Sequence, residues 1–357
     1  MSFGRAGRHK GMTTNGSSKM ESTTMGNSRQ AGTPEAESIV SAVREGDESA
    51  FTAVTSRYRR ELHLYCYRML GSFSDAEDMV QETYLRAWRR RESFQGRSSL
   101  RAWLYAIATN GCLDFLDARA PRVLTADGSG NAPRHVPWLE PYPDRLMGEP
   151  EAIAVARETI ALAYLVAIQF LPPRQRAVLI LTDVLEWSAK ETADLLDLSV
   201  PSVTSALQRA RATLRTHVRS GRPDARPAVD PDERERTLLD RYVEATERGD
   251  VKALATVLRD DLRFSMPPEP GTFAGRDVVV ESWVRGGFGT PAFGEFRCVL
   301  TRANRMPAVA CYLRKPGDTA YRPLALDVLQ IEDGLIVEII TFPLEGRFQD
   351  FGLPPVL

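Results

Sequence analysis

Polar and cationic side chains gather on one face of a short stretch near the middle of the chain, where they could hydrogen-bond to base edges and phosphates of DNA. The helix predicted from Val200 to Arg215 has an apolar stripe at helical spacing, formed by Val203, Leu207, Ala210 and Leu214. With that stripe facing inward, the outer face includes Ser202, Thr204, Ser205, Gln208, Arg209 and Arg211.

A second short helix pattern precedes this face. Ser188 can cap that helix, and Glu191 stands where a capping box needs it. Asp197-Leu198-Ser199 then breaks the pattern, and Ser199 can cap the helix that follows. Two short helices joined by a tight turn, the second with a basic outer face, are typical of a helix-turn-helix that reads DNA with its second helix. An ordinary helical hairpin has the same pattern, so this stretch alone leaves both interpretations open.

Upstream, an acidic helix is predicted to begin at Ser74, with Glu77 completing a capping box. Negative charge in the first turns suits the helix dipole. The face would also suit docking on a basic protein partner, although a solvated surface has the same pattern. Its outward acidic and amide residues are Asp75, Asp78, Gln81 and Glu82.

A polar loop from Phe94 to Ser99 leads into a helix that mixes aromatic and cationic side chains. Aromatic rings among Arg and Asn beside a polar loop fit the handling of single-stranded DNA, whose bases stack or enter pockets. The helix also contains residues that we expect in the core, namely Trp103, Leu104, Ile107 and Leu113. The loop residues have no comparable role in a core.

The composition is that of a globular chain of two or three domains, with 357 residues, 43% hydrophobic and 26% charged, and a net charge of −1. The basic residues are clustered, which indicates specific polyanion-binding surfaces. The four cysteines and four histidines are scattered without zinc-site spacing, so we expect no metal or cofactor and predict buried, reduced thiols. No apolar run is long enough to span a membrane.

Changes in composition divide the chain. We predict a disordered extension or an over-called start in 1–34, a helical domain in 35–120 and a second in 151–220, with Gly46-Asp47 separating a first helix from a long second one. The segment 121–150 is a proline-rich linker whose Trp138, Leu139 and Tyr142 are candidate docking side chains. After a linker at 221–231, residues 232–357 predict helices followed by alternating strands, with a hairpin turn at 331–335.

Residues 38–220 resemble a sigma factor of the extracytoplasmic-function group in the sigma-70 family. EGDESAFTAVTSRYRRELHLYCYRMLG resembles the first part of region 2, and DAEDMVQETYLRAWRR resembles its polymerase-clamp-binding helix. FQGRSSLRAWLYAIATN resembles the promoter-melting segment that reads the −10 element, and the stretch from LPPRQRAVL to ARATLR resembles region 4. The resemblance implies a transcription initiation factor that binds core RNA polymerase (β′ clamp and β flap) and promoter DNA, duplex at −35 and single-stranded at −10.

The resemblance also implies roles for single residues. The helix that docks on the clamp would present Asp75, Glu77, Asp78, Gln81 and Glu82. The −10 loop and reading segment would use Gly96, Arg97, Ser98, Ser99, Arg101, Asn110 and Arg119. The −35 readers would be Ser202, Thr204, Ser205, Gln208 and Arg209, with Arg211 and Arg215 nearer phosphates. The family usually has Lys or Arg where Thr204 and Ala206 stand, so we expect an uncommon −35 sequence.

From Asp232 to Val356 the chain resembles SnoaL-like domains of the nuclear-transport-factor-2 cone fold, and within them ketosteroid isomerase. Tyr242 matches the oxyanion-hole tyrosine and Asp327 the protonated partner acid. Met266 stands at the position of the catalytic base and cannot abstract a proton. These three residues would line a pocket for a small ligand, and a filled core is the equal alternative.

The expected fold is therefore two all-α domains followed by an α+β cone, and the expected function is that of a cytoplasmic, non-enzymatic sigma factor. Its tail would modulate activity in cis, through a small ligand or a regulatory protein. Two alternatives stay open from the residues. One is a SnoaL-type or isomerase-type enzyme fused to a DNA-binding half. The other is a repressor that binds duplex DNA without polymerase, although it would have no use for the acidic helix or the melting loop.

Overall fold

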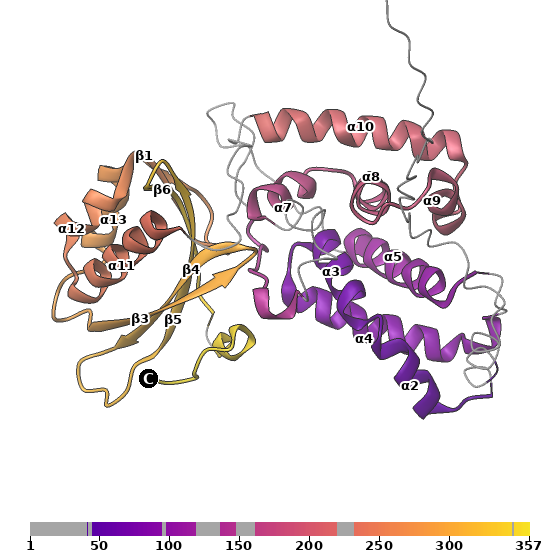
Figure 1. Cartoon of the computed structure of the whole chain (residues 1–357), viewed down its shortest axis with the longest axis horizontal. Helices are drawn as coiled ribbons and strands as arrows, with labels where there is room; N and C mark the ends of the chain where they lie inside the picture. Colours follow the sequence, from indigo (N-terminus) through magenta and orange to yellow (C-terminus); the bar gives the residue numbers. More distant parts are fainter. Residues whose placement is uncertain are drawn as a thin grey trace, which may run out of the picture.

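A helical half and a half built around a β-sheet lie side by side in the computed structural model (Figure 1). The structure describes residues 41, 45–94, 98–118, 136–147, 161–219, 232–344 and 346–357, without the side chains of 217–219. Several sequence predictions lie outside these ranges, namely the extension 1–34, the linker 221–231 and the site residues Gly96, Arg97 and Arg119. The predicted fold class, two helical units followed by an α+β domain, is confirmed.

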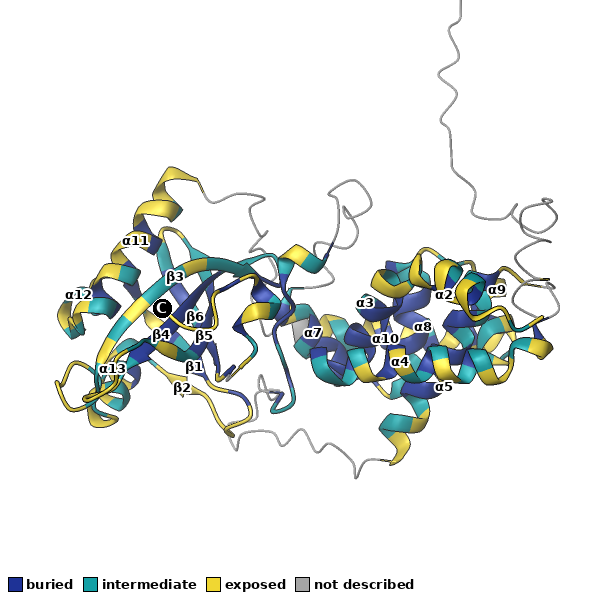
Figure 2. Ribbon diagram, turned by 90° about the horizontal axis from the view of Figure 1, so that it is seen from below, coloured by how far each residue is buried: buried dark blue, intermediate teal, exposed yellow. Residues whose placement is uncertain are grey.

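The helical half contains two groups of helices joined by the linker. The first group is α2 (Glu48–Ser56), α3 (Arg59–Leu70), α4 (Phe73–Arg89), a 3-10 turn (Arg91–Ser93) and α5 (Leu100–Ala118). The second is α7 (Leu162–Gln169), α8 (Pro173–Leu179), a π-helical turn (Ile180–Val184), α9 (Ala189–Leu196) and α10 (Val200–Arg219). Buried side chains run along the inner faces of α3, α4, α5 and α8 (Figure 2).

Two local predictions in the first group are wrong. The expected single long helix divides into α2 and α3, because Tyr58 N–H and the Tyr84 hydroxyl both bond to the Thr55 carbonyl, at 2.9 Å and 2.8 Å, and so satisfy it at the break. The cap of α4 is Ser72, whose hydroxyl accepts from the Asp75 amide at 3.1 Å. Ser74, the predicted cap, lies inside the helix.

The tail forms a six-stranded sheet with helices on one face (Figure 1). The helices are α11 (Glu233–Arg248), α12 (Val251–Val257) and α13 (Arg276–Arg285). The strands are β1 (Leu258–Ser265), β2 (Phe273–Ala274), β3 (Glu295–Ala303), β4 (Met306–Arg314), β5 (Arg322–Glu332) and β6 (Leu335–Phe342), followed by a 3-10 turn (Phe348–Phe351). Their order is β2-β1-β6-β5-β4-β3, antiparallel except for β1 beside β6. The predicted β5–β6 hairpin is confirmed.

The apolar cores show how the halves are joined. Alternate residues of β4 face opposite sides of the sheet, so Val309 and Cys311 pack with α11–α13, whereas Ala310 and Tyr312 belong to the other face. That other face is part of one apolar cluster with the linker and the helices of both helical groups. The tail therefore packs directly against the helical half through this face of its sheet.

Candidate nucleic-acid interface

The helix-turn-helix forms as the sequence predicts. The Ser188 hydroxyl accepts from the Glu191 amide at 3.1 Å, and the Glu191 carboxylate accepts from the Ser188 amide at 2.9 Å, which completes the capping box of α9. Asp197 takes a left-handed conformation (φ 53°) that ends α9, and Ser199 caps α10. Val203 is fully buried between the two helices.

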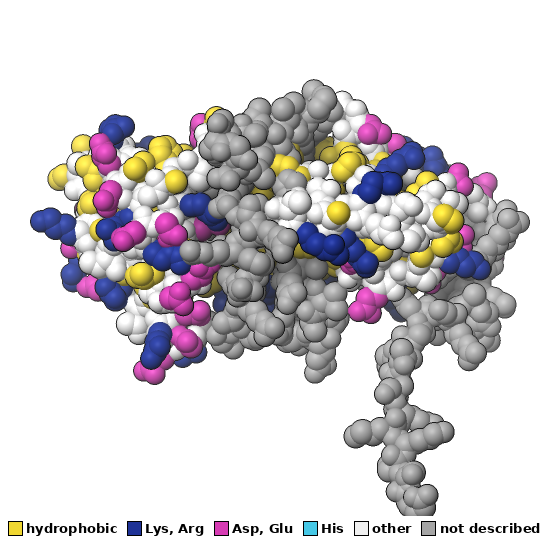
Figure 3. Space-filling model, turned by 90° about the horizontal axis from the view of Figure 1, so that it is seen from above, with side chains coloured by type: hydrophobic (Ala, Val, Ile, Leu, Met, Phe, Trp, Pro, Cys, Tyr) yellow, Lys and Arg dark blue, Asp and Glu magenta, His cyan; other side chains and the backbone are white. Residues whose placement is uncertain are grey.

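The outer face of α10 is exposed and basic (Figure 3). The predicted −35 readers all lie on it, namely Ser202, Thr204, Ser205, Gln208, Arg209, Arg211 and Arg215. Arg211 forms a bidentate ion pair with Asp183, in which Nε and Nη2 donate to the two carboxylate oxygens at 2.9 Å and 2.7 Å. Within the described part of the chain, Arg209 and Arg215 have no ion-pair partner, so their guanidinium groups are available to an outside anion.

One sequence inference about this helix needs correction. Ala206 is 8% exposed and packs with Val178, Ala193 and Val203 inside the helix-turn-helix. A cation at this position would point into the protein, so Ala206 says nothing about base contacts. Thr204 is exposed and remains the informative position, with its hydroxyl bonded to the Val200 carbonyl at 3.0 Å.

The predicted −10 residues differ in exposure and in whether they are already bonded within the protein. Ser98, Ser99 and Asn110 are exposed, and the Ser99 hydroxyl accepts from the Ala102 amide at 3.1 Å, at the start of α5. Arg101 is engaged elsewhere. Its guanidinium pairs with Glu61 at 2.9 Å and lies 5.5 Å from the centroid of the Trp187 ring, which precedes α9. The segment predicted to read the −10 element thus touches the start of the helix-turn-helix.

The acidic face of α4 is partly engaged within the protein. Glu77 pairs with Arg59 at 3.2 Å, and Glu82 pairs with Arg86 at 2.7 Å, while Asp75 is half-buried. Asp78 and Gln81 are exposed. Sequence reasoning missed Leu85, which is 51% exposed one helical turn beyond Gln81. The signal was an apolar residue on an otherwise polar face.

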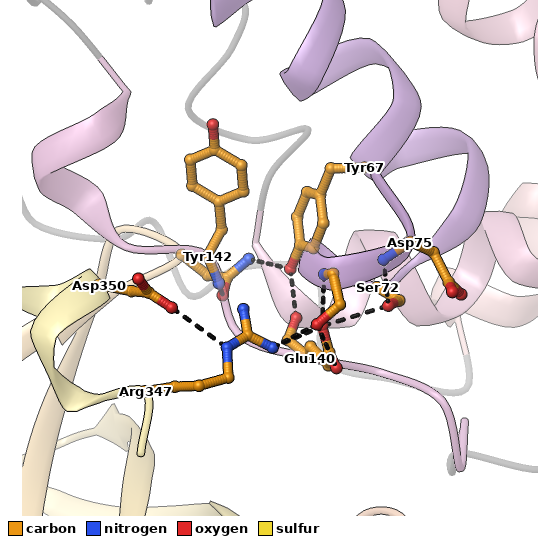
Figure 4. A network of polar contacts seen from close by, with 9 residues as sticks. Tyr67, Ser72, Asp75, Glu140, Tyr142, Arg347 and Asp350 are labelled. Carbon is orange, nitrogen blue, oxygen red and sulfur yellow. Dashed lines mark hydrogen bonds and ion pairs between the residues drawn. The ribbon is translucent and has the colours of Figure 1, made fainter. Parts of the chain in front are cut away.

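A polar network joins the linker to both halves, and sequence reasoning missed its central ion pair, Glu140 and Arg347 (Figure 4). Glu140 accepts from the Ser74 amide at 2.7 Å, at the start of α4, and pairs with Arg347 of the tail at 3.2 Å. Arg347 also donates to the Ser74 hydroxyl and lies 5.0 Å from the centroid of the Phe73 ring. Glu140 therefore contacts both the first turn of α4 and the tail.

A second set of contacts fixes the linker to the turn between β3 and β4. The buried Asn304 side chain accepts from the Tyr142 amide at 2.7 Å and donates to the Tyr67 hydroxyl of α3 at 2.9 Å. Asp144 pairs with Arg302 at 3.3 Å, and burial raises the pKa of its carboxyl. Of the candidate docking side chains, Leu139 and Tyr142 are buried and Trp138 is half-buried.

The predicted pocket residues of the tail do not come together as a set. The Tyr242 hydroxyl donates to Asp327 at 3.0 Å, and Thr341 donates to the same carboxylate at 2.6 Å. Burial raises the pKa of both Asp327 and Tyr242. Met266 is 37% exposed and is not in the apolar cluster around Tyr242. The pair resembles an oxyanion-binding arrangement in which the tyrosine is already bonded to the acid.

Metal sites and membrane-spanning helices bear on other functions of the described residues. These residues contain no group of His, Cys, Asp and Glu side chains placed to hold a metal ion. Among the helices that the structure describes, none has the length and apolar content needed to cross a membrane.

Comparisons with known proteins agree with this architecture. The family model of sigma-70 region 2 matches residues 54–122, that of sigma-70 region 4 matches 161–214, and that of the SnoaL-like domain matches 239–339. The ECF RNA polymerase sigma factor SigG of Mycobacterium tuberculosis is 42% identical over 327 residues, 88% of this chain and 86% of SigG. SigW of Bacillus subtilis is 30% identical over 181 residues, 50% of this chain and 95% of SigW.

The crystal structure of the extracytoplasmic function sigma factor SigJ of Mycobacterium tuberculosis has the same fold. It matches with a TM-score of 0.52 at 23% identity, over 85% of this chain and all of SigJ. A region 2, a region 4 and a SnoaL-like domain in one chain define a sigma-70-type factor with a fused tail. The chain belongs to the ECF RNA polymerase sigma factors.

Proposed function

We propose that this protein is a promoter-specificity factor for RNA polymerase. In this role α4 docks on the polymerase clamp, the segment 96–119 captures the single-stranded −10 element, and α10 reads duplex DNA at −35. The observation that carries the proposal is the pair of surfaces on one chain: an acidic helix face at Asp78 and Gln81, and a basic one at Arg209 and Arg215. A repressor would need only the second. Such a factor would act in the cytoplasm, where its polymerase and promoters are.

The test is transcription in vitro with core polymerase and a promoter selected from a random library. Asp78→Lys combined with Gln81→Lys should lower transcription and polymerase affinity at least tenfold, because the charge of the docking face becomes more positive by three units. Both residues are exposed, and the pair leaves the Glu82–Arg86 ion pair intact.

The matched control is Thr237→Lys combined with Asp240→Lys on α11, which has the same spacing, charge change and exposure in the tail. The control should retain full activity. Equal loss in both double variants would mean that general charge, not docking through α4, sets polymerase affinity.

We propose further that the tail is not an enzyme and acts in cis on the sigma regions. Met266 cannot serve as a base, and the hydroxyl of Tyr242 is already used by Asp327. What supports action in cis is the position of Arg347, whose partners Glu140 and Ser74 lie in the linker and in the polymerase-docking helix.

Arg347→Ala tests that coupling without removing the tail. We expect a change of several-fold in transcription from the selected promoter, because the Glu140 carboxylate at the start of α4 loses its cation. Arg285→Ala, which removes an exposed tail arginine paired with Glu281 at 2.8 Å, is the control and should change nothing. Identical transcription by both variants and the unaltered protein would refute action through this contact.

A further inference from the structure

Two of the four cysteines meet in the tail, although they are far from a C-x-x-C spacing. Cys298 of β3 and Cys311 of β4 are direct partners in the strand register, and their sulfur atoms are 3.8 Å apart. Cys298 is half-exposed at the sheet edge, whereas Cys311 is 4% exposed. Cys298 is therefore the less buried of the two residues, and the two sulfur atoms lie side by side.

The hydrogen bonds around Cys298 define the geometry of the pair. Its backbone N–H donates to the Glu247 carboxylate of α11 at 2.9 Å, so it points away from β4. Partners whose N–H groups point away from each other form the non-hydrogen-bonded type of antiparallel pair, in which the Cα atoms approach to about 4.5 Å. That separation lies at the short end of the range that disulfides span, so the two sulfurs can come to about 2 Å by side-chain rotation.

We propose that Cys298 and Cys311 form an oxidisable dithiol site that converts to an intramolecular disulfide on exposure to a hydroperoxide. Cys298 Sγ attacks the peroxide, the O–O bond breaks, and the alcohol or water leaves with the Cys298 proton, which yields a sulfenic acid. Cys311 Sγ then displaces hydroxide from Cys298. The S–S bond forms, and the hydroxide takes the Cys311 proton to become water.

The surroundings of the two sulfur atoms determine which one attacks the peroxide and which one forms the disulfide afterwards. In the reduced state Cys298 donates to Cys311, and Cys311 donates to the Asp327 carboxylate at 3.5 Å. The contact with Cys298 and burial hold the pKa of the Cys311 thiol well above its usual range. Because the thiolate is the nucleophile, the less buried Cys298 reacts first and Cys311 resolves the intermediate.

The bond would close the β3–β4 hairpin, whose turn holds the linker through Asn304. Oxidation would therefore fix the element that joins the tail to the linker. Disulfides in a reducing compartment are transient and often redox-sensing, which fits a site that is a dithiol at rest. This inference is independent of the proposed promoter function.

The experiment uses the full chain, reduced and then treated with hydrogen peroxide. Free thiols are counted in denaturant with a mass-adding maleimide, and linked peptides are identified by mass. We expect the loss of two of the four thiols, a cross-linked peptide pair that contains Cys298 and Cys311, and full recovery with dithiothreitol. Cys66 and Cys112, fully buried in α3 and α5, are the internal control and should stay reduced.

Two variants distinguish this route from non-specific oxidation. Cys311→Ser should stop at a sulfenic acid on Cys298, trapped by a cyclic 1,3-diketone, without a disulfide. Cys66→Ser combined with Cys112→Ser should form the disulfide as the unaltered protein does. Retention of all four thiols, oxidation at Cys66 and Cys112, or disulfides only between molecules would each overturn the proposal.

Discussion

At the scale of single residues, α10 shows that exposure and availability differ. Arg209 and Arg211 are both exposed arginines on the reading helix, but only Arg211 is paired, through Asp183. An arginine held by a carboxylate must give up that partner before it can bind a phosphate. We therefore expect the ion pair to lower the affinity of this face for DNA.

Asp183→Asn should strengthen binding to duplex −35 DNA, because it frees the Arg211 guanidinium. If Arg211 then contacts one phosphate, the slope of log K against log salt should steepen by about 0.9. Fluorescence anisotropy titrations at several salt concentrations measure both quantities. Asp194→Asn removes the same charge from an exposed position of α9 and is the control. Equal effects of the two variants would show that only net charge matters.

At the scale of elements, the linker is a structural component of region 2. Tyr142 packs against Tyr67 and Phe73, with ring centroids 4.9 Å and 5.4 Å away, and its hydroxyl bonds to His63 Nδ1 at 3.1 Å. Burial, with help from Arg59, lowers the pKa of His63 to about 4. His63 is therefore neutral where the linker docks.

That shift predicts acid sensitivity of the docked linker. A depressed folded-state pKa means that His63 contributes stability above its unfolded pKa of about 6.5, and that this stability is lost as the pH falls through 4. The full loss in the free energy of unfolding is about 3 kcal/mol, because the pKa is lowered from 6.5 to about 4 and each pKa unit corresponds to about 1.4 kcal/mol. Urea unfolding followed from pH 7 to 4 measures it. His63→Gln cannot protonate and should have a flatter profile; parallel profiles for the two proteins would contradict the assignment.

At the scale of the whole molecule, the two segments that we propose read the promoter pack against each other. Trp187 lies 5.3 Å from the Tyr105 ring, and buried Arg176 of α8 donates to the Met69 carbonyl of α3. Elements at −35 and −10 are about 25 base pairs apart, or about 85 Å of duplex at 3.4 Å per pair. If these segments bind the two elements as we propose, they cannot stay in contact, and we expect the compact arrangement to open on the promoter.

Energy transfer between fluorophores at Asp117 of α5 and Lys190 of α9, both exposed, reports that opening. We expect high transfer in the free protein and a marked decrease when core polymerase and promoter DNA are added. The Asp78→Lys, Gln81→Lys double variant, which should bind polymerase at least tenfold more weakly, should keep the high value at concentrations where the unaltered protein is bound. Transfer that stays high in a transcribing complex would rule out opening between α5 and α9.

Local patterns in the sequence predicted the elements well and the contacts between them poorly. The capping box at Ser188 and Glu191 depends on neighbours in the chain, and it formed as predicted. Arg101, Ala206 and Met266 were placed by resemblance, and their surroundings depend on residues far away in sequence. The Cys298–Cys311 pair was not predicted, although a hairpin register would have indicated it. Both residues lie equally far from the turn Asn304-Arg305, whose positive φ angles (54° and 63°) suit a two-residue hairpin.

The Glu140 carboxylate has a consequence for how this molecule responds to its partners. Because it touches both the first turn of α4 and Arg347 of the tail, the energies of the two contacts are linked. Thermodynamic linkage is reciprocal: if an event in the tail changes polymerase affinity by some factor, bound polymerase changes the equilibrium of that event by the same factor. If α4 docks on polymerase as we propose, polymerase would be an effector of the tail as much as the tail would be an effector of polymerase binding.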